Sequence, residues 1–157
     1  MSHVTIDQVV PDFELPSTGE ENFQLSAHRG HNIILYFYPK DNTPGCTQEG
    51  QDFRDNIAFF NQHETDIFGI SRDSVKVHQG FKQKHGFPFE LLSDKTEEAC
   101  QLFDVIQLKK NYGREYMGLV RSTFLIDKAG ILRQEWRNIR VKGHIEQVKQ
   151  AITQLSL

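Results

Sequence analysis

The chain has 157 residues, of which 38% are hydrophobic and 25% are charged, and its net charge at neutral pH is −3. This length predicts one globular domain over residues 1–157 with a sizeable core, and the mild charge balance argues against a nucleic-acid-binding protein. The longest apolar run, at 33–38, is far shorter than the ~20 residues of a membrane helix, and the amino terminus lacks the features of a secretion signal, so we expect a cytoplasmic protein without a membrane anchor.

The first part of the chain predicts a β-hairpin, a buried strand and a helix. Short extended pieces at 13–15 and 22–25 flank a turn signal at 16–19. The run at 32–38 is almost continuously apolar and rich in β-branched and aromatic residues, which is typical of a strand buried on both faces. Apolar residues at helical spacing then predict a helix from about 44 to 62.

The rest of the chain alternates between strands and helices. In order, we expect a strand at 66–71, a helix from 73 to about 84, a strand at 89–92, a helix after Ser93–Asp94, a polar segment at 107–118, strands at 119–126 and 131–137, and a helix at about 142–155. The strands at 32–38 and 66–71 are linked through a helix, so we expect them to form a parallel βαβ unit. The later hairpin, at 119–126 and 131–137, adds antiparallel strands. The sequence therefore predicts an α/β fold with a central mixed sheet flanked by helices, in the layout of a thioredoxin-like fold.

The turn between the strand at 32–38 and the next helix holds the strongest candidate for a reactive group. Thr43 suits the N-cap and Pro44 the first helical position, which places Cys46 at the third. Free N–H groups and the positive end of the helix dipole favour an anion there. Cys46 should therefore be more thiolate than a free cysteine, and the thiolate is the nucleophile. The alternative is a structural cysteine packed between helix and strand.

A thiolate in this turn could attack a small substrate held by the Thr43 hydroxyl and backbone amides. Attack on a peroxide would release hydroxide or alkoxide and leave a sulfenic acid, and a nearby cation would lower the barrier. Arg121 is the candidate cation, because it precedes the apolar strand run at 122–126 and its fork can address sulfur and oxygen together. The alternative is a surface salt-bridging arginine. Glu49 would either orient an arginine or only favour the helix start.

The other cysteine and the histidines give weaker signals. Cys46 and Cys100 are the only cysteines and form no CxxC motif, which argues against a secreted disulfide framework and a zinc ribbon. His28 and His31 have the only ligand-like spacing among the histidines, but their polar turn favours a surface loop over a metal site. We therefore expect neither a metal nor a cofactor.

The pattern Pro39-x-x-x-Thr43-x-x-Cys46 matches the active-site motif of the peroxiredoxins, and the string at 37–49 resembles their bacterioferritin-comigratory-protein branch, also called peroxiredoxin Q. Further matching motifs cover nearly the whole chain, at 53–55, 69–73, 91–94, 116–118 and 121–127. The resemblance implies a thioredoxin-fold thiol peroxidase that reduces hydrogen peroxide and alkyl hydroperoxides. In the family roles, Cys46 would be the peroxidatic cysteine and Thr43 would hydrogen-bond the peroxide. Pro39 would shield the sulfenate from solvent, and Arg121 would stabilise the thiolate and the leaving group.

The chain departs from the family at the resolving cysteine. Many members carry it five positions after the peroxidatic one, where this chain has Gln51, so the usual intrahelical disulfide is impossible. Cys100 is the only other partner within one molecule, and the favoured interpretation is that it fills a small, partly buried site. A one-cysteine mechanism is simpler, with an external thiol such as thioredoxin, glutaredoxin or glutathione meeting the sulfenic acid. Disulfides between two molecules stay open.

Other interpretations and partners also follow from these features. A peroxide sensor or holdase-type binding protein on the same fold, with little turnover, is the main alternative, because a missing recycling thiol would stall the enzyme. A disulfide oxidoreductase is disfavoured by the absence of CxxC. The segment 104–110 differs from the Trp-containing stretch of many relatives, which would alter substrate access or partner docking. The resemblance implies a monomer or weak dimer that needs a hydroperoxide and a thiol reductant.

Overall fold

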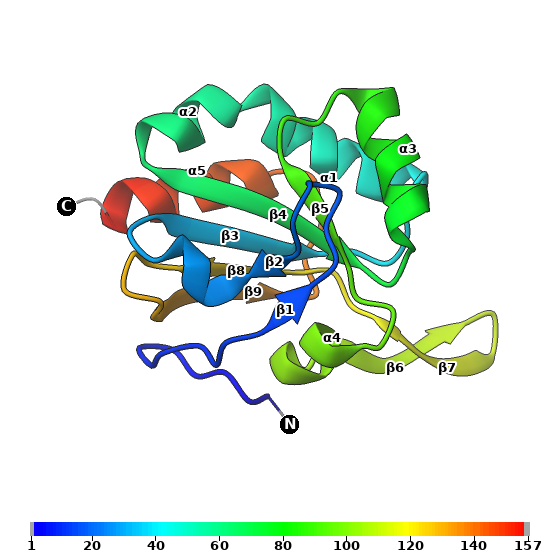
Figure 1. Cartoon of the computed structure of the whole chain (residues 1–157). Helices are drawn as coiled ribbons and strands as arrows, with labels where there is room; N and C mark the ends of the chain where they lie inside the picture. The colour runs from blue at the N-terminus through cyan, green and yellow to red at the C-terminus, as the bar shows by residue number, and fades with distance from the viewer. Residues whose placement is uncertain (1, 156–157) are drawn as a thin grey trace.

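The computed structural model describes residues 2–155 and shows a mixed five-stranded sheet with helices on both faces (Figure 1). In chain order the elements are β1 (Glu14–Leu15), β2 (Phe23–Gln24), the 3₁₀ helix η1 (Leu25–His28), β3 (Asn32–Phe37), α1 (Pro44–Asp55), α2 (Ile57–Gln62), β4 (Thr65–Ser71), α3 (Val75–His85), β5 (Glu90–Ser93), α4 (Glu98–Phe103), β6 (Ile106–Asn111), β7 (Arg114–Leu119), β8 (Ser122–Ile126), β9 (Leu132–Arg137) and α5 (His144–Leu155). The predicted mixed α/β architecture and the amino-terminal hairpin, β1–β2, are confirmed.

The strand order in the central sheet is β5-β4-β3-β8-β9. β3, β4 and β5 run parallel, whereas β8 is antiparallel to β3 and β9 is antiparallel to β8. The predicted βαβ unit from β3 to β4 is therefore present. In the register of β3 with β8, Phe37 pairs with Ser122, so the start of β8 lies at the carboxyl end of β3. The loops that leave β3 and β4 and the residue before β8 thus share one edge of the sheet.

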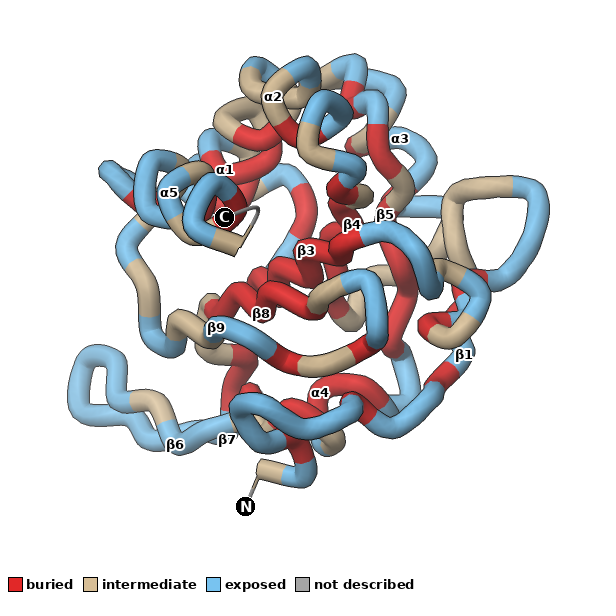
Figure 2. Tube along the Cα trace, turned by 90° about the vertical axis from the view of Figure 1, so that its left-hand side faces the viewer, coloured by how far each residue is buried: buried red, intermediate tan, exposed pale blue. Residues whose placement is uncertain are grey.

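β3 is buried along its whole length, as its sequence predicts (Figure 2). Its alternating side chains enter two separate cores. Ile33, Leu35 and Phe37 belong to one core, and Ile34 and Tyr36 belong to the other. The first, the α4-side core, includes Phe13, Phe23, Leu25, Ala99, Cys100 and Phe103. The second, the α1-side core, includes Cys46, Phe53, Phe60, Phe81, Val148 and Ile152. The sheet therefore separates α4 and the amino-terminal segment from α1, α2, α3 and α5.

The single helix predicted from 44 to 62 is wrong, because Asn56 divides it into α1 and α2. The backbone of Asn56 leaves the helical region at φ −113° and ψ 15°, and its side-chain amide donates to the Asp52 carbonyl at 2.8 Å. An asparagine side chain that bonds its own helix competes with backbone hydrogen bonding and interrupts the regular ladder. The apolar spacing continues across the break, so the sequence pattern does not reveal it.

The polar segment predicted at 107–118 is instead an antiparallel hairpin, β6–β7, which extends away from the sheet (Figure 1). Its two-residue turn, Tyr112–Gly113, has positive φ at both residues, as a type I′ turn requires. The strand predicted at 119–126 is correspondingly two strands, since β7 ends at Leu119 and β8 begins at Ser122. Most of the hairpin is exposed (Figure 2), so its side chains lack the alternation that a half-buried strand would show.

Candidate active site

Cys46 lies at the third residue of α1, where the sequence places it, with Thr43 at the N-cap and Pro44 at the first helical position. Thr43 has an extended backbone, and its carbonyl accepts the N–H of Thr47 at 2.9 Å, which closes the first turn. The Cys46 side chain packs in the α1-side core and is 2% exposed. The sulfur is therefore held beside the helix start in a nearly dry environment.

Arg121 reaches Cys46 from the start of β8. Its Nη2 donates to Cys46 Sγ at 3.4 Å, and its Nη1 donates to the carboxylate of Glu49 at 2.6 Å. The side chain is 16% exposed, so little water screens either interaction. Burial acts to lower the pKa of Arg121, but Glu49 and Cys46 outweigh it, so the pKa lies above its ordinary value. The structure thus brings together three of the predicted site residues, although Arg121 and Cys46 are 75 positions apart.

Glu49 lies one helical turn after Cys46 and is buried, with 2% of its side chain exposed. Loss of hydration raises the pKa of this carboxyl to about 7, although Arg121 opposes the shift. Within residues 2–155, Glu49 Oε2 and the Tyr36 hydroxyl are buried without a hydrogen-bond partner. Of the two roles that the sequence left open for Glu49, the ion pair with Arg121 is the one present in the structure.

Thr43 and Pro39 belong to the loop between β3 and α1 and are both half-buried. The Thr43 side chain does not cap α1. Its Oγ1 instead donates to the Lys40 carbonyl at 2.8 Å, which leaves the lone pairs of the hydroxyl oxygen available to another donor. Pro39 follows Tyr38 at the end of the strand run, in the same loop as Thr43.

Cys100 lies in α4 and is completely buried in the α4-side core, on the other side of the sheet from Cys46. The expected partly buried site is thus a fully buried one. Its backbone N–H and that of Ala99 donate to the Asp94 carboxylate, at 2.7 and 3.1 Å. Burial, and then the negative charge of Asp94, raise the pKa of the Cys100 thiol far above its usual range. Both cysteines are free.

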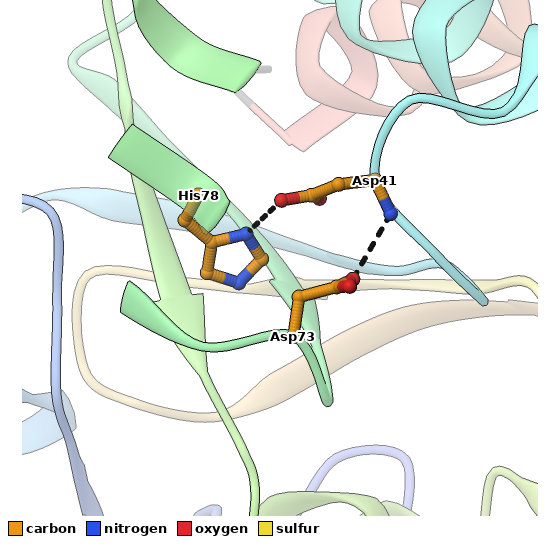
Figure 3. Close-up of side chains that lie close together, drawn as sticks. All are labelled: Asp41, Asp73 and His78. Atoms are coloured by element: carbon orange, nitrogen blue, oxygen red, sulfur yellow. Dashed lines mark hydrogen bonds and ion pairs between the residues drawn. The ribbon is translucent and has the colours of Figure 1, made fainter. Parts of the chain in front are cut away.

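A second polar cluster, which the sequence analysis missed, lies beside the same loop (Figure 3). Asp41, Asp73 and His78 bring their side chains within 4.8 Å of one another, and they are the only such group of potential metal ligands in the described part of the chain. Asp41 stands inside the Pro39–Cys46 motif, but nothing in the sequence links it to a histidine 37 positions later.

His28 and His31 both contact a carboxylate. Both imidazoles lie near the Asp66 carboxylate, with Nδ1 to oxygen distances of 3.6 and 3.3 Å, and His31 is exposed whereas His28 is half-buried. The exposed position of His31 matches the expectation from the polar turn. Across residues 2–155, the structure has no helix that is long and apolar enough to span a bilayer.

Comparison with known proteins gives consistent matches in sequence. The model of the AhpC/TSA family matches residues 6–135. The chain is 48% identical to peroxiredoxin Bcp of Bacillus subtilis over 153 residues, which are 98% of each protein. It is 44% identical to peroxiredoxin Bcp of Xanthomonas campestris over 154 residues, or 97% of this chain and 96% of the relative.

Solved structures agree with these matches. A Xanthomonas campestris bacterioferritin comigratory protein, whose alkyl peroxide reduction activity was the subject of that structure, superposes with a TM-score of 0.88 at 43% identity, covering 92% of both chains. A cysteine-to-serine mutant of Xylella fastidiosa PrxQ superposes with a TM-score of 0.93 at 37% identity over the whole of both chains. The predicted thioredoxin-like fold is therefore confirmed together with the mixed sheet.

Proposed function

Because this chain belongs to the AhpC/TSA family, as a peroxiredoxin of the Bcp or peroxiredoxin Q type and hence a thiol peroxidase, we propose that it reduces hydrogen peroxide and alkyl hydroperoxides through Cys46. The observation that carries this assignment is the contact between Arg121 and the sulfur of Cys46 at the first turn of α1. A cysteine beside a fixed cation and free helix N–H groups is well placed to react as a thiolate.

In the proposed step, the Cys46 thiolate attacks one peroxide oxygen and the O–O bond breaks. The electron pair of that bond leaves on the second oxygen, which takes up a proton to give water or an alcohol, while Cys46 becomes a sulfenic acid. Negative charge moves from sulfur to the departing oxygen, and the Arg121 guanidinium stabilises it throughout because its planar fork can contact both atoms.

The other predicted residues have supporting roles in this proposal. The buried ion pair with Glu49 fixes the Arg121 fork toward Cys46, because one guanidinium nitrogen is already engaged at 2.6 Å. The Thr43 hydroxyl accepts a hydrogen bond from the peroxide, using the oxygen lone pairs that its bond to Lys40 leaves available. Pro39 shields the sulfenic acid from water at the mouth of the site.

We also propose a one-cysteine cycle. Gln51 replaces the resolving cysteine of many relatives. Cys100 lies across the sheet from Cys46, and its thiol stays protonated because burial raises its pKa far above the usual range. An external thiol such as thioredoxin would attack the sulfenic acid, releasing water and forming a mixed disulfide that a second thiol reduces. A cytoplasmic location and a monomeric or weakly dimeric state stay predictions.

Intact-mass spectrometry after one equivalent of hydrogen peroxide tests both proposals. We expect the reduced protein and Cys100→Ser to gain one oxygen that dimedone traps, and Cys46→Ser to gain none and to lose peroxide consumption. Loss of two hydrogens in the wild type but not in Cys100→Ser would overturn the one-cysteine cycle. Full peroxide consumption by Cys46→Ser would overturn the mechanism. Oxidation without sustained turnover, over a panel of thioredoxin, glutaredoxin and glutathione, would favour the sensor or holdase alternative.

A further inference from the structure

His78 is a fully buried histidine whose two ring nitrogens both face hydrogen-bond acceptors. Figure 3 shows the contact with Asp41. Nδ1 lies 2.6 Å from the Asp41 carboxylate, and Nε2 lies 2.9 Å from the Leu92 carbonyl oxygen. A carbonyl oxygen only accepts, so Nε2 carries a proton, and Nδ1 donates to Asp41 when that carboxylate is ionised. The geometry therefore places a proton on Nε2 and a short hydrogen bond between Nδ1 and the Asp41 carboxyl.

This pair lies where a lone imidazolium would be unfavourable. His78 is in the first turns of α3, close to the positive end of the helix dipole, and it is sealed from water. The Asp41 carboxylate compensates, and its second oxygen accepts a hydrogen bond from the Tyr38 hydroxyl at 2.6 Å. A buried pair of this kind contributes little net stability, but removal of one partner leaves the other charge buried and unpaired.

Asp41 is the central residue of the loop at 39–43, which carries Pro39 and Thr43. Its backbone N–H donates to the Asp73 carboxylate at 2.9 Å, and the same carboxylate oxygen accepts from the Ser71 hydroxyl at 2.6 Å. The loop is thus tied to the β4–α3 connection through the backbone of Asp41 and to α3 through its side chain. The next residue, Asn42, has φ +65°, a left-handed conformation that asparagine adopts more readily than most other residues.

We propose that the Asp41–His78 pair is a positioning device for peroxide binding. It holds the loop at 39–43 against α3 so that the Thr43 hydroxyl and Pro39 stay in place over Cys46. Neither residue touches the reacting atoms, and the inference rests on the proposed peroxidase function. A metal site is not the better interpretation, because protein partners already occupy both nitrogens of His78 and both oxygens of Asp41.

Two rate constants for Cys46 separate positioning from a general structural effect. Oxidation by hydrogen peroxide needs the thiolate and the peroxide-holding loop, whereas alkylation by iodoacetamide needs only the thiolate. For His78→Ala, we expect the peroxide rate constant of the folded protein to fall about 30-fold, because small displacements of a substrate-holding group have large effects on rate. Alkylation should stay within about twofold of wild type, since within residues 2–155 no hydrogen bond or ion pair joins Asp41 or His78 to Cys46, Arg121 or Glu49.

Conservative and control variants complete this experiment. His78→Asn keeps a donor toward Asp41 and should restore about half of the lost free energy of activation, that is, a fall of about fivefold. His31→Asn removes a surface histidine from its pair with Asp66 and should change neither rate constant. Circular dichroism at low temperature gives the folded fraction, and His78→Asn serves if His78→Ala does not fold.

Three outcomes would overturn the inference while the wild type still reacts with peroxide. These are a peroxide rate constant for both His78 variants within about twofold of wild type, equal falls in the two rate constants, or fully multiplicative effects of Asp41→Ala and His78→Ala. Residues that act as one device should instead give a double variant no slower than the slower single variant. A wild type that does not react with peroxide would contradict the proposed function itself, and so the two failures are distinguishable.

Discussion

At the residue scale, the planar guanidinium of Arg121 donates hydrogen bonds to both the sulfur of Cys46 and the carboxylate of Glu49. Arg121→Lys keeps the charge but has no fork that reaches both groups, so the rate constant for Cys46 oxidation should fall about tenfold. Arg121→Ala should lower it about 100-fold, in line with the loss of one fixed donor from a transition state. Stopped-flow measurement with hydrogen peroxide gives both values.

A matched control for these variants is Arg133→Ala. Arg133 also binds two acidic groups, Asp7 and Asp127, but it lies on β9 beside the far end of β8 and is part-exposed. Its removal should leave the oxidation rate unchanged. If Arg121→Ala reacted as fast as Arg133→Ala, the role proposed for Arg121 would be refuted.

Glu49 gives a prediction for stability against pH. Burial raises its pKa from 4.5 to about 7, so the folded protein keeps a proton that the unfolded chain loses first. This contribution to the free energy of unfolding is fully present below about pH 4.5 and is lost as the pH rises through about 7. Relative to Glu49→Gln, the wild type should therefore lose up to about 3 kcal/mol between pH 4.5 and 8.

Urea unfolding of both proteins at several pH values within that window measures the difference. Glu135→Gln is the control, because Glu135 also pairs with an arginine, Arg137 at 3.3 Å, but at the surface. If the free energy of unfolding varied with pH in the same way for wild type and Glu49→Gln, Glu49 would not titrate between pH 4.5 and about 7 as proposed.

At the element scale, the seating of α1 on the α1-side core depends on a glycine. A Cβ at Gly50 would lie 2.4 Å from Cζ of Phe87, whereas a Cβ at Gly80 in α3 would meet nothing within 4 Å. Gly50→Ala should therefore lower the free energy of unfolding by about 1–3 kcal/mol through overpacking. Gly80→Ala should raise it by about 0.5–1 kcal/mol through helix propensity. Chemical denaturation compares the pair, and equal effects would contradict this account of α1 packing.

The elements also show what a sequence pattern can and cannot predict. β3 was predictable because a continuous apolar run is a local signal in the sequence. The βαβ unit was predictable because a helix connects two neighbouring strands of the chain. The break at Asn56 was not, since one side-chain hydrogen bond interrupts a helix whose apolar spacing continues. The β6–β7 hairpin was missed because it is mostly exposed, although Tyr112–Gly113 between two runs of equal length was an available turn signal.

The candidate site likewise contains residues that the sequence predicts and residues that it does not. Cys46 and Thr43 lie in one short motif with a local physical reason for their positions, whereas Pro39 came only from the resemblance to the peroxiredoxins. Arg121 followed from its place before a strand. The pair of Asp41 with His78 was not predictable, because it joins two segments whose proximity depends on how α3 packs beside β4 and β5. The open question about Glu49 likewise needed the distance to Arg121.

At the scale of the whole molecule, the sheet lies between the only two cysteines. With excess peroxide and no added thiol, we therefore expect Cys46 to pass from sulfenic to sulfinic acid, visible as a second added oxygen in the intact mass. Gln51→Cys should protect against this by forming a disulfide with Cys46. Five helical residues span about 7.5 Å along the axis, so this disulfide requires local unwinding of α1.

The matched control is Gln48→Cys, an exposed position in the same helix. It lies two residues from Cys46 and on a different face of α1, and we expect no protection there. Equal over-oxidation of wild type and Gln51→Cys would show that α1 does not open at its start.

The separation of the two thiols also determines how the protein would work over time. On the proposed cycle, each molecule stores no second pair of reducing electrons, so it removes one peroxide and then waits for an outside donor. Its immediate capacity equals its own concentration, and its sustained output follows the supply of reduced thiol rather than the supply of peroxide. Such a protein acts as a stoichiometric buffer during a short burst and as a catalyst only when the surrounding metabolism keeps delivering electrons.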